Sequence, residues 1–540
     1  MATITLLSAY LISIVALVFF IIAMIRGWFD SDGRGAEVIF APNEIGTTDD
    51  PAASVEARKA LQATLPVARA PDPKELEARA AADDSSRLLT FVFMGCSILW
   101  LLVVSATGLI ASIKLHSPDW LGAYEWLTFG RIRTLHLNAM AYGFLSTAGF
   151  GIAFWLLPRL LKTTLRGERL ALFGGVLWNA GLVAGMGAIA AGISDGLEWL
   201  EMPWQACILL VIGGAMMALP LVLTIKHRTV KHLYVSVWYM GAALFWFPTL
   251  FIVAKLPGVH FGVEQAAMNW WYGHSVLGLF FSPLAIATIY YFLPKVMGVP
   301  IKSYSLSVLG FWTLAFFYGQ VGGHHLVGSP VPSWLITLSI VQSMMMIIPV
   351  VAFGVNQFYT MRGHMSMLVH SPTLRFMAFG GLMYLATSLQ GSFEALRSMN
   401  TVVHFTHYTV AHAHLGLYAF VAMTFFGGMY FIMPRVMERE WPYPKLILWH
   451  FWLSAIGVTV YFVGLTIGGW LQGMAMLDAA RPFMESVAVT LPYLKARSVG
   501  GGLMTLGHLV FATHFLLMVL KLGPARHAPA TFYAPKGQTA

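Results

Sequence analysis

Residues 407–420 read HYTVAHAHLGLYAF, an apolar stretch in which a single alanine separates His412 from His414. On a helix with 3.6 residues per turn, two positions correspond to about 200° of rotation, so the two rings point to opposite sides of one helix. Neutral imidazole is a usual axial ligand of haem iron, and burial helps to keep the ring neutral. One helix can therefore hold two cofactors.

The composition around this stretch is that of a membrane protein. Of 540 residues, 58% are hydrophobic and only 11% are charged, which lies outside the range of soluble globular proteins. A bilayer core about 30 Å thick needs roughly 20 apolar residues per helix. We expect about thirteen such spans, which begin near residues 3, 87, 134, 168, 204, 234, 269, 304, 333, 373, 407, 446 and 501.

The positions of the basic residues behind the net charge of +9 indicate the membrane topology. The basic residues lie in short loops on every second connection rather than in one patch, so we expect no nucleic acid partner and place these loops in the cytoplasm. The intervening loops are acidic or almost uncharged, which is typical of the outer side. The basic loops contain Arg159, Lys162, Arg166 and Arg169, then Lys226, Arg228 and Lys231, then Lys295 and Lys302, then Arg435, Arg439 and Lys445.

Composition also divides the chain. Residues 1–26 are expected to form one isolated span, 27–86 a soluble cytoplasmic connector, 87–522 a block of twelve spans, and 523–540 a cytoplasmic tail. Within the connector, Asp72–Arg87 is interpreted either as a short amphipathic helix on the membrane surface or as a linker. The two cysteines lie inside spans, so no disulfide framework is implied. No Cys-x-x-Cys-His occurs, so the chain attaches no c-type haem.

Further histidines fall inside the spans. His324 and His325 are adjacent in VGGHHLVGSP (321–330), and His274 lies in WWYGHSVLGLFF (270–281). An intramembrane histidine is a functional hypothesis by default, and its alternative is a ring that is hydrogen-bonded to a neighbouring helix. Three imidazoles with an open position describe a copper site that can bind a small molecule.

His136, in TFGRIRTLHLNAMAYGF (128–144), is the remaining deep candidate. Paired with His414 it would make a six-coordinate haem, which suits electron transfer because no ligand position is free. Arg131 and Arg133 precede it, and their guanidinium groups match haem propionates in two-point geometry. The alternative for these arginines is a simple membrane-surface anchor.

The order and spacing of these six histidines resemble subunit I of the haem–copper oxidase superfamily. Within it, TFGRIRTLHLNA, WWYGHSVLGLFF, IYYFLPK (289–295), GGHH and HFTHYTVAHAHLG look most like the C-family, the cbb(3)-type cytochrome c oxidases. The similarity covers roughly residues 87 to 520. It implies an all-α, twelve-helix membrane bundle in a bacterial inner membrane, here with one additional N-terminal span.

The resemblance also implies cofactors and their ligands. His136 and His414 would bind a low-spin haem b and His412 a high-spin haem of b type. One copper ion would be bound by His274, His324 and His325. Tyr318 lies where the family has an active-site tyrosine that is covalently joined to the histidine matching His274.

Further roles follow from the same resemblance. Tyr290, Tyr304 and Ser307 match a proton path, and each is alternatively an ordinary interface or packing residue. Glu198 resembles a glutamate that helps to bind calcium, and its alternative is a solvated loop carboxylate. His404 joins Arg131 and Arg133 as an expected propionate contact.

The chain departs from the family at two places. The tenth span carries Gln390 where a glutamate is usual, with Glu394 one turn later and Arg397 in place of a lysine. The first 40 residues resemble a small single-span assembly protein encoded alongside cbb(3) oxidases, and an unrelated membrane anchor is the alternative.

The implied function is four-electron reduction of dioxygen to water, coupled to proton translocation, with electrons from membrane-anchored cytochrome c subunits. One alternative is a nitric oxide reductase, which uses non-haem iron and a nearby glutamate. Leu277, three residues after His274, and the presence of Tyr318 favour the oxidase. The second alternative is a non-catalytic haem-binding transporter or assembly protein, but the repeat symmetry and broken helices of transporters are not evident.

Overall fold

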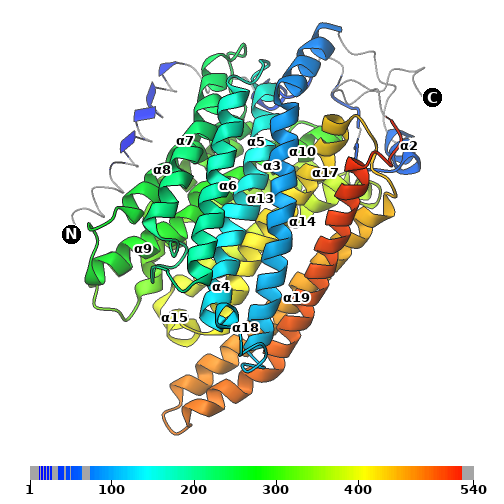
Figure 1. Ribbon diagram of the computed structural model, residues 1–540. Helices are drawn as coiled ribbons and strands as arrows, with labels where there is room; N and C mark the ends of the chain where they lie inside the picture. Colours follow the sequence, from blue (N-terminus) through cyan, green and yellow to red (C-terminus); the bar gives the residue numbers. More distant parts are fainter. Residues whose placement is uncertain are drawn as a thin grey trace.

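The fold is a bundle of long, roughly parallel helices (Figure 1). This computed structural model describes residues 34–41, 44–48, 50–63 and 73–525, together with single positions between 11 and 26. The expected first span therefore lies largely outside the described residues, as does most of the 523–540 tail. Within the described residues the chain is an all-α, multi-pass membrane protein, as its composition predicts.

The first half of the bundle is built from helices that follow one another with short connections. In chain order they are α2 (Val55–Ala63), α3 (Pro73–Lys114), α4 (Phe129–Asn138), η3 (Ala139–Leu145), α5 (Ser146–Leu160), α6 (Glu168–Ala190), α7 (Trp204–Lys226), α8 (Val235–Lys255), α9 (Gly262–Val276), η4 (Leu277–Phe281) and α10 (Ser282–Met297).

The second half continues in the same way. Its helices are α11 (Tyr304–Phe317), η5 (Tyr318–Leu326), α12 (Ser333–Met345), α13 (Ile347–Met361), η6 (Met365–Val369), α14 (Pro372–Ala395), α15 (Arg397–Val403), α16 (His407–His414), η7 (Leu415–Ala422), α17 (Met423–Met437), α18 (Lys445–Leu477) and α19 (Phe483–Val519).

Ten helices or helix runs in the described residues are long and apolar enough to cross a bilayer. The spans expected near residues 304 and 373 correspond to α11 with η5 and to α14, which are not among the ten. Helix α11 has only 14 residues, because the chain tightens into the glycine-rich 3₁₀ segment η5 at Tyr318. The expected total of twelve spans after the connector stays a prediction.

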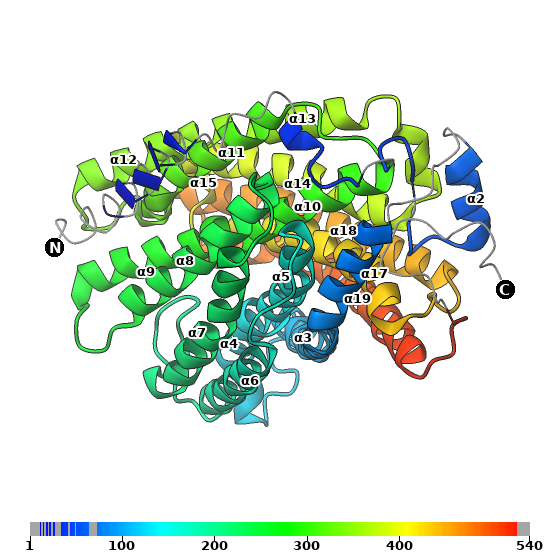
Figure 2. The same ribbon diagram turned by 90° about the horizontal axis from the view of Figure 1, so that it is seen from above.

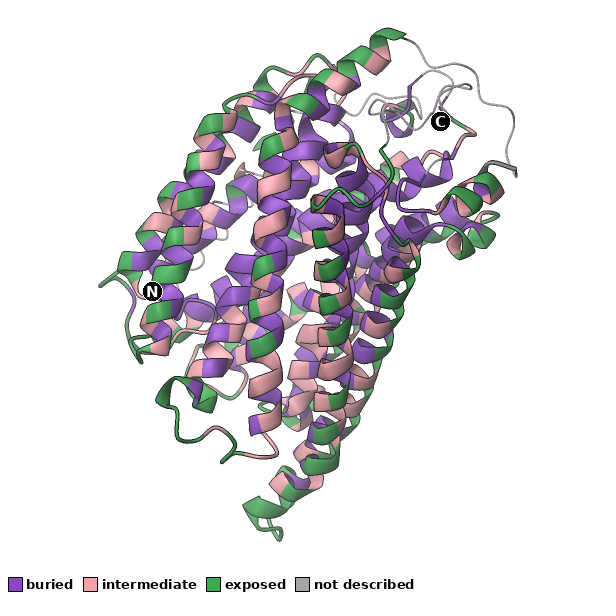
Figure 3. Cartoon of the chain, turned by 45° about the vertical axis from the view of Figure 1, so that its right-hand side comes forward, coloured by how far each residue is buried: buried purple, intermediate pink, exposed green. Residues whose placement is uncertain are grey.

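Burial separates a central layer from a peripheral one. In the most apolar part of the runs 129–160, 262–297 and 407–437, 94%, 89% and 89% of the residues are buried. In the most apolar part of α7, only 33% are buried. These three central runs carry four of the six histidines quoted above, and their parts α5, α10 and α17 lie between α6–α7 on one side and α11–α13 on the other (Figure 2). Exposed side chains gather on the outer faces and at the tip between α18 and α19 (Figure 3).

Each central run contains a π-helical segment next to a histidine. The segments η3, η4 and η7 begin within three residues after His136, His274 and His414, respectively. A π-helical turn inserts an extra residue and re-aims the neighbouring side chains, which is why such turns are common at functional sites.

The connector is packed against the end of the bundle that carries the basic loops. The Glu44 carboxylate accepts hydrogen bonds from Arg79 of α3 and, at 2.6 Å, from Lys295 of α10. Asp50 accepts hydrogen bonds from Ser371 Oγ at 2.6 Å and Thr373 Oγ1 at 2.7 Å, at the start of α14. These contacts tie Glu44 and Asp50 to three helices.

The segment expected as a surface helix or linker, Asp72–Arg87, is not separate from the bundle, since α3 begins at Pro73 and continues without a break into the membrane span. Its acidic residues pair with the basic loops. Asp83 Oδ1 accepts from Arg159 at 2.9 Å, and Glu75 Oε2 accepts from Lys162 at 2.9 Å. These two ion pairs hold the start of α3 against the basic loop.

Candidate functional site

Two parallel imidazole rings form the first part of the site. The rings of His136, at the end of α4, and His414, at the end of α16, lie 6.3 Å apart between centroids and 9° from parallel. His136 Nδ1 donates to the Val104 carbonyl and His414 Nδ1 to the Val410 carbonyl, both at 2.9 Å. A carbonyl only accepts, so each Nδ1 carries the proton and each Nε2 keeps its lone pair for a metal.

Close neighbours hold these two rings in place. A Cβ at Gly108 of α3 would lie 2.6 Å from the His136 ring, so only glycine leaves room for the ring there. Tyr461 of α18 stacks on His414 with centroids 4.3 Å apart. The sequence pattern identified the histidines but not these supporting residues, which come from other helices.

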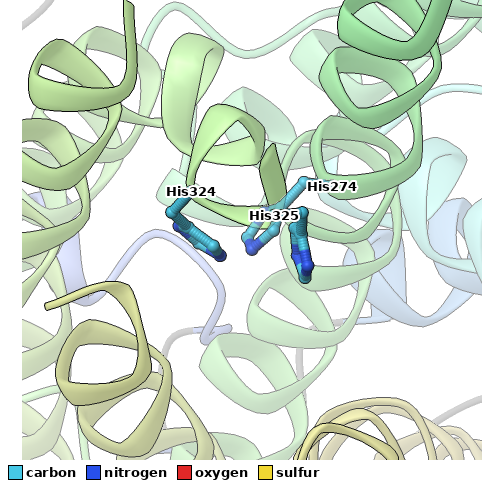
Figure 4. Close-up of side chains that lie close together, drawn as sticks. All are labelled: His274, His324 and His325. Carbon is cyan, nitrogen blue, oxygen red and sulfur yellow. The ribbon is translucent and has the colours of Figure 1, made fainter. Parts of the chain in front are cut away.

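Three more histidines, which lie on α9 and η5, form the second part of the site. His274 of α9 and His324 and His325 of η5 offer nitrogen atoms that all lie within 4.8 Å of one another, and Figure 4 shows the rings facing a common space. His324 Nδ1 bonds Ser343 Oγ at 2.9 Å, whereas His274 Nδ1 is buried without a protein partner. Three imidazoles that share one small space suit a metal ion that prefers nitrogen.

Tyr318 lies beside this triad, with its ring centroid 5.3 Å from that of His274. A Cβ at Gly278 of η4 would fall 1.7 Å from the Tyr318 ring, so the ring occupies the space that any side chain at position 278 would need. The structure thus brings together Tyr318 and His274, the two residues that the family resemblance links.

His412 faces the opposite side of α16 from His414, toward α14. Its Nδ1 lies 3.5 Å from Thr387 Oγ1 and 3.8 Å from Glu394 Oε1. A Cβ at Gly391 would come within 2.9 Å of its ring. Gln390 Oε1, where the family has its glutamate, is buried without a partner.

All six histidines line one cavity of about 600 Å³, together with Tyr318. Most of the exposed lining is apolar, which suits the faces of a flat macrocycle. The cavity also contains Arg133, Glu198, His404 and Arg497. The residues predicted as ligands from distant parts of the sequence therefore meet in a single space.

The predicted propionate and calcium residues are placed as follows. Arg133 Nη2 donates to Glu198 Oε1 at 2.7 Å, and both line the cavity. Arg131 lies outside the lining and donates to the Ala190 carbonyl at 3.1 Å. His404 lines the cavity with its ring stacked on exposed Phe405, and burial lowers the pKa of His404.

Arg497 of α19 was not predicted. Its guanidinium lies 5.3 Å above the Tyr461 ring, its Nε has no protein partner, and it lines the cavity. A cation inside an apolar span was a usable signal, because such a residue faces the bundle interior and seeks an anionic group.

The predicted proton path is only partly continuous. Tyr290 OH is buried without a protein partner, Tyr304 OH donates to the Leu233 carbonyl at 2.8 Å, and Ser307 Oγ donates to the Tyr304 carbonyl at 2.6 Å. Phe353 packs against both Tyr290 and Tyr384, and Tyr384 lines the cavity with Tyr318. Tyr384 was not predicted, because a lone aromatic in an apolar span carries no pattern.

Comparison with known proteins identifies the family. The model of cytochrome c and quinol oxidase polypeptide I matches residues 89–503. The cbb3-type cytochrome c oxidase subunit CcoN1 of Stutzerimonas stutzeri is 31% identical over 452 residues, covering 80% of this chain and 95% of that protein. The chain belongs to the cytochrome c and quinol oxidase polypeptide I family, in its cbb(3)-type branch.

Other members of the family are also similar. A cytochrome c oxidase subunit 1 homolog of Bradyrhizobium diazoefficiens is 30% identical over 448 residues, covering 79% of this chain and 81% of that protein. A nitric oxide reductase subunit of Stutzerimonas stutzeri is 24% identical over 444 residues, covering 76% and 90%. A solved heme–copper terminal oxidase dimer shares the fold, with a TM-score of 0.65, 17% identity and coverage of 83% and 86%.

Proposed function

We propose that this chain is the catalytic subunit of a terminal respiratory oxidase. It would reduce dioxygen to water with four electrons from cytochrome c and couple this reaction to proton translocation across a bacterial inner membrane. The observation that carries the proposal is the convergence of the triad His274, His324 and His325 with His412 and Tyr318 on one cavity.

The family implies haem and copper, and the residues fit both. His136 and His414 would hold a low-spin haem b, because both Nδ1 atoms are engaged by carbonyls and both Nε2 atoms are left for iron. His412 would hold a high-spin haem, and His274, with its unpartnered nitrogen, would hold copper with His324 and His325. When bound, the high-spin haem and the copper supply the electrons and the open positions at which dioxygen is reduced.

Tyr318 would deliver a proton and an electron from its phenol as the O–O bond breaks. Its ring lies against His274, at the wall of the cavity that faces the triad. Protons would reach it from the cytoplasmic side along Tyr304, Ser307 and Tyr290, and Tyr384 stands between Tyr290 and the cavity.

Positive groups at the other end of the cavity would bind the haem propionates. Arg133 and His404 line this region, and Arg497 adds a guanidinium that the sequence pattern did not reveal. Arg131 is also proposed as a propionate contact, and its side chain would have to turn away from the Ala190 carbonyl to reach the propionate. Calcium at Glu198 would compete with the Arg133 ion pair.

Electrons would come from membrane-anchored cytochrome c subunits, because the sequence has no c-type haem motif of its own. The additional N-terminal span would be a fused assembly protein, with the connector as its junction. The contacts of Glu44 and Asp50 with α3, α10 and the start of α14 support a fixed junction.

Nitric oxide reduction is the second candidate, because a nitric oxide reductase subunit shares the fold family. Iron favours an added carboxylate ligand, whereas the triad here consists of three imidazoles and the third residue after His274 is Leu277. The experiment that tests the proposal combines oxygen consumption with carbon monoxide binding in the reduced, purified complex. A complex that binds no carbon monoxide has no open iron position, and the oxidase proposal then fails.

A further inference from the structure

The two rings of the proposed low-spin pair are held by different kinds of neighbour. His136 is packed against the backbone of α3, since a Cβ at Gly108 would lie 2.6 Å from its ring. His414 is packed against an aromatic ring from another helix. The ring of Tyr461 in α18 lies with its centroid 4.3 Å from that of His414 and its plane 30° from parallel. Tyr461 belongs to none of the proposed ligand sets, so its place beside an axial ligand needs a reason.

The backbone at Tyr461 is held by the neighbouring helix α19. A Cβ at Gly500 of α19 would lie 2.9 Å from Tyr461 N and 3.1 Å from Tyr461 Cβ. A Cβ at Gly457, one turn earlier in α18, would lie 2.8 Å from the Gly500 carbonyl oxygen. The two helices therefore touch backbone to backbone at this level. The Tyr461 side chain, which is 3% exposed, is fixed at its base.

Helix α18 is also bonded to α16, the helix that carries His414. Gln472 Oε1 of α18 accepts a hydrogen bond from His407 N, at the start of α16, at 3.0 Å. The bond from His414 Nδ1 to the Val410 carbonyl stays within one helix. It therefore does not relate the ring to the rest of the bundle. Tyr461 adds a contact from outside α16, and a flat ring stacked on the imidazole restricts its rotation.

A cation lies over the same tyrosine. The guanidinium carbon of Arg497 is 5.3 Å from the Tyr461 ring centroid, which is a cation–π distance. Both residues line a small cavity of about 120 Å³ together with His136 and His414. Reduction lowers the charge of a haem iron by one unit. A fixed positive charge nearby therefore favours the reduced haem, and this effect is large where the dielectric constant is low.

We propose that Tyr461 is a positioning residue that fixes the plane of His414 and raises the midpoint potential of the low-spin haem. This proposal rests on the proposed function. Tyr461 acts through two neighbours, because it keeps His414 parallel to His136 and holds Arg497 beside the haem cavity. The groups around a metal ligand set the potential through orientation, charge and the exclusion of water. No bond forms or breaks at Tyr461 when the haem takes up an electron.

The effect belongs to electron entry and not to the chemistry on oxygen. A higher potential at the low-spin haem favours electron transfer from the external cytochrome c. Neither Tyr318 nor any histidine of the triad lines the small cavity with Tyr461. Changes at Tyr461 should therefore alter the low-spin haem and leave carbon monoxide binding at the high-spin haem intact.

The test uses the full complex with its electron-donating subunits. A redox titration followed at the absorption of the low-spin haem measures its midpoint potential. Electron paramagnetic resonance of the oxidised complex measures the g values, which depend on the angle between the two imidazole planes, 9° in this structure. We expect Tyr461→Leu to lower the equilibrium constant for reduction by about tenfold, which is about 59 mV for a one-electron couple. The g values should shift or broaden, because His414 is then free to turn.

Three further variants complete the test. Tyr461→Phe keeps the ring and removes only a hydroxyl that makes no hydrogen bond among the described residues, so both measurements should match the unaltered protein. Phe462→Leu is the matched control. It removes an aromatic ring about 100° further round α18 that lines neither cavity, and it should change neither measurement. Tyr461→Met fills the space without a flat ring, so it carries the test if Tyr461→Leu does not retain the haem.

The outcomes separate this inference from the proposed function. Unaltered potential and g values in Tyr461→Leu and Tyr461→Met, with the haem retained, would overturn the inference. Equal shifts in Tyr461→Phe and Tyr461→Leu would also overturn it, because the hydroxyl and not the ring would then act. Both results leave the oxidase proposal standing. An unaltered complex that shows no low-spin haem signal or binds no carbon monoxide would instead remove the proposed function.

Discussion

His412 and His414 illustrate how single residues define this site. They are separated only by Ala413, yet His414 lies parallel to His136 and His412 lies against α14. The rotation of about 200° between them follows from helix geometry alone. The identity of the opposing partners does not, because it depends on which helices lie on either side of α16.

Separate replacements of the two histidines should have separable effects. We expect His414→Leu to remove the low-spin haem spectrum, because His136 alone leaves that iron with one protein ligand. His412→Leu should remove carbon monoxide binding to the reduced complex. Optical spectra before and after reduction measure both, and an exchange of the two phenotypes would mean that the two ligands are reversed.

Tyr318 should matter for turnover and not for cofactor binding. We expect Tyr318→Phe to keep both haem spectra and to lower oxygen consumption by about 10²–10⁴-fold, which is the scale on which a positioned proton donor contributes. An oxygen electrode measures the rate, and metal analysis of the same sample checks that copper is retained. Oxygen consumption near that of the unaltered protein would remove Tyr318 from the mechanism.

At the scale of elements, the packing of the connector on the bundle depends on buried charge. Glu44 is 3% exposed and lies between Arg79 and Lys295. Burial by itself raises the pKa of Glu44, but Lys295 and Arg79 outweigh it and hold the pKa well below its usual value of 4.5. Since the folded pKa is depressed, the stabilisation is complete above the unfolded pKa and is lost as pH falls toward the folded one.

Removing this carboxylate should loosen the connector. We expect Glu44→Gln to cost about 3–5 kcal/mol, because it removes the buried carboxylate that two buried cations share. Thermal unfolding in detergent and limited proteolysis between residues 34 and 63 measure the effect, which should shrink at acidic pH. Glu37→Gln, at an exposed position in the same segment, is the control, and equal protease sensitivity in the two variants would contradict the assigned role.

At the scale of the whole molecule, three largely buried helix runs pass the site, and η5, α14 and α19 complete its lining. One cavity holds all six predicted ligands. The described residues thus bring the six proposed iron and copper ligands together within one chain, whereas the sequence contains no attachment motif for the haem that would supply electrons.

The metal content of the complex is the corresponding prediction. Beyond the haems of the partner subunits, we expect two b-type haems and one copper for each copy of this chain, because the three-imidazole site suits copper. Elemental analysis with haem extraction measures these ratios. A non-haem iron in place of copper would favour nitric oxide reduction.

The sequence by itself determined the membrane fold class, the six candidate ligands and the departure at Gln390. Hydrophobic runs and helical rotation are local properties, so they can be recognised without knowing which helices touch. Only the tertiary structure decided which distant groups meet. Arg497 at the haem cavity, Thr387 and Glu394 beside His412, and Glu44 between α3 and α10 depend on the packing of helices far apart in the chain.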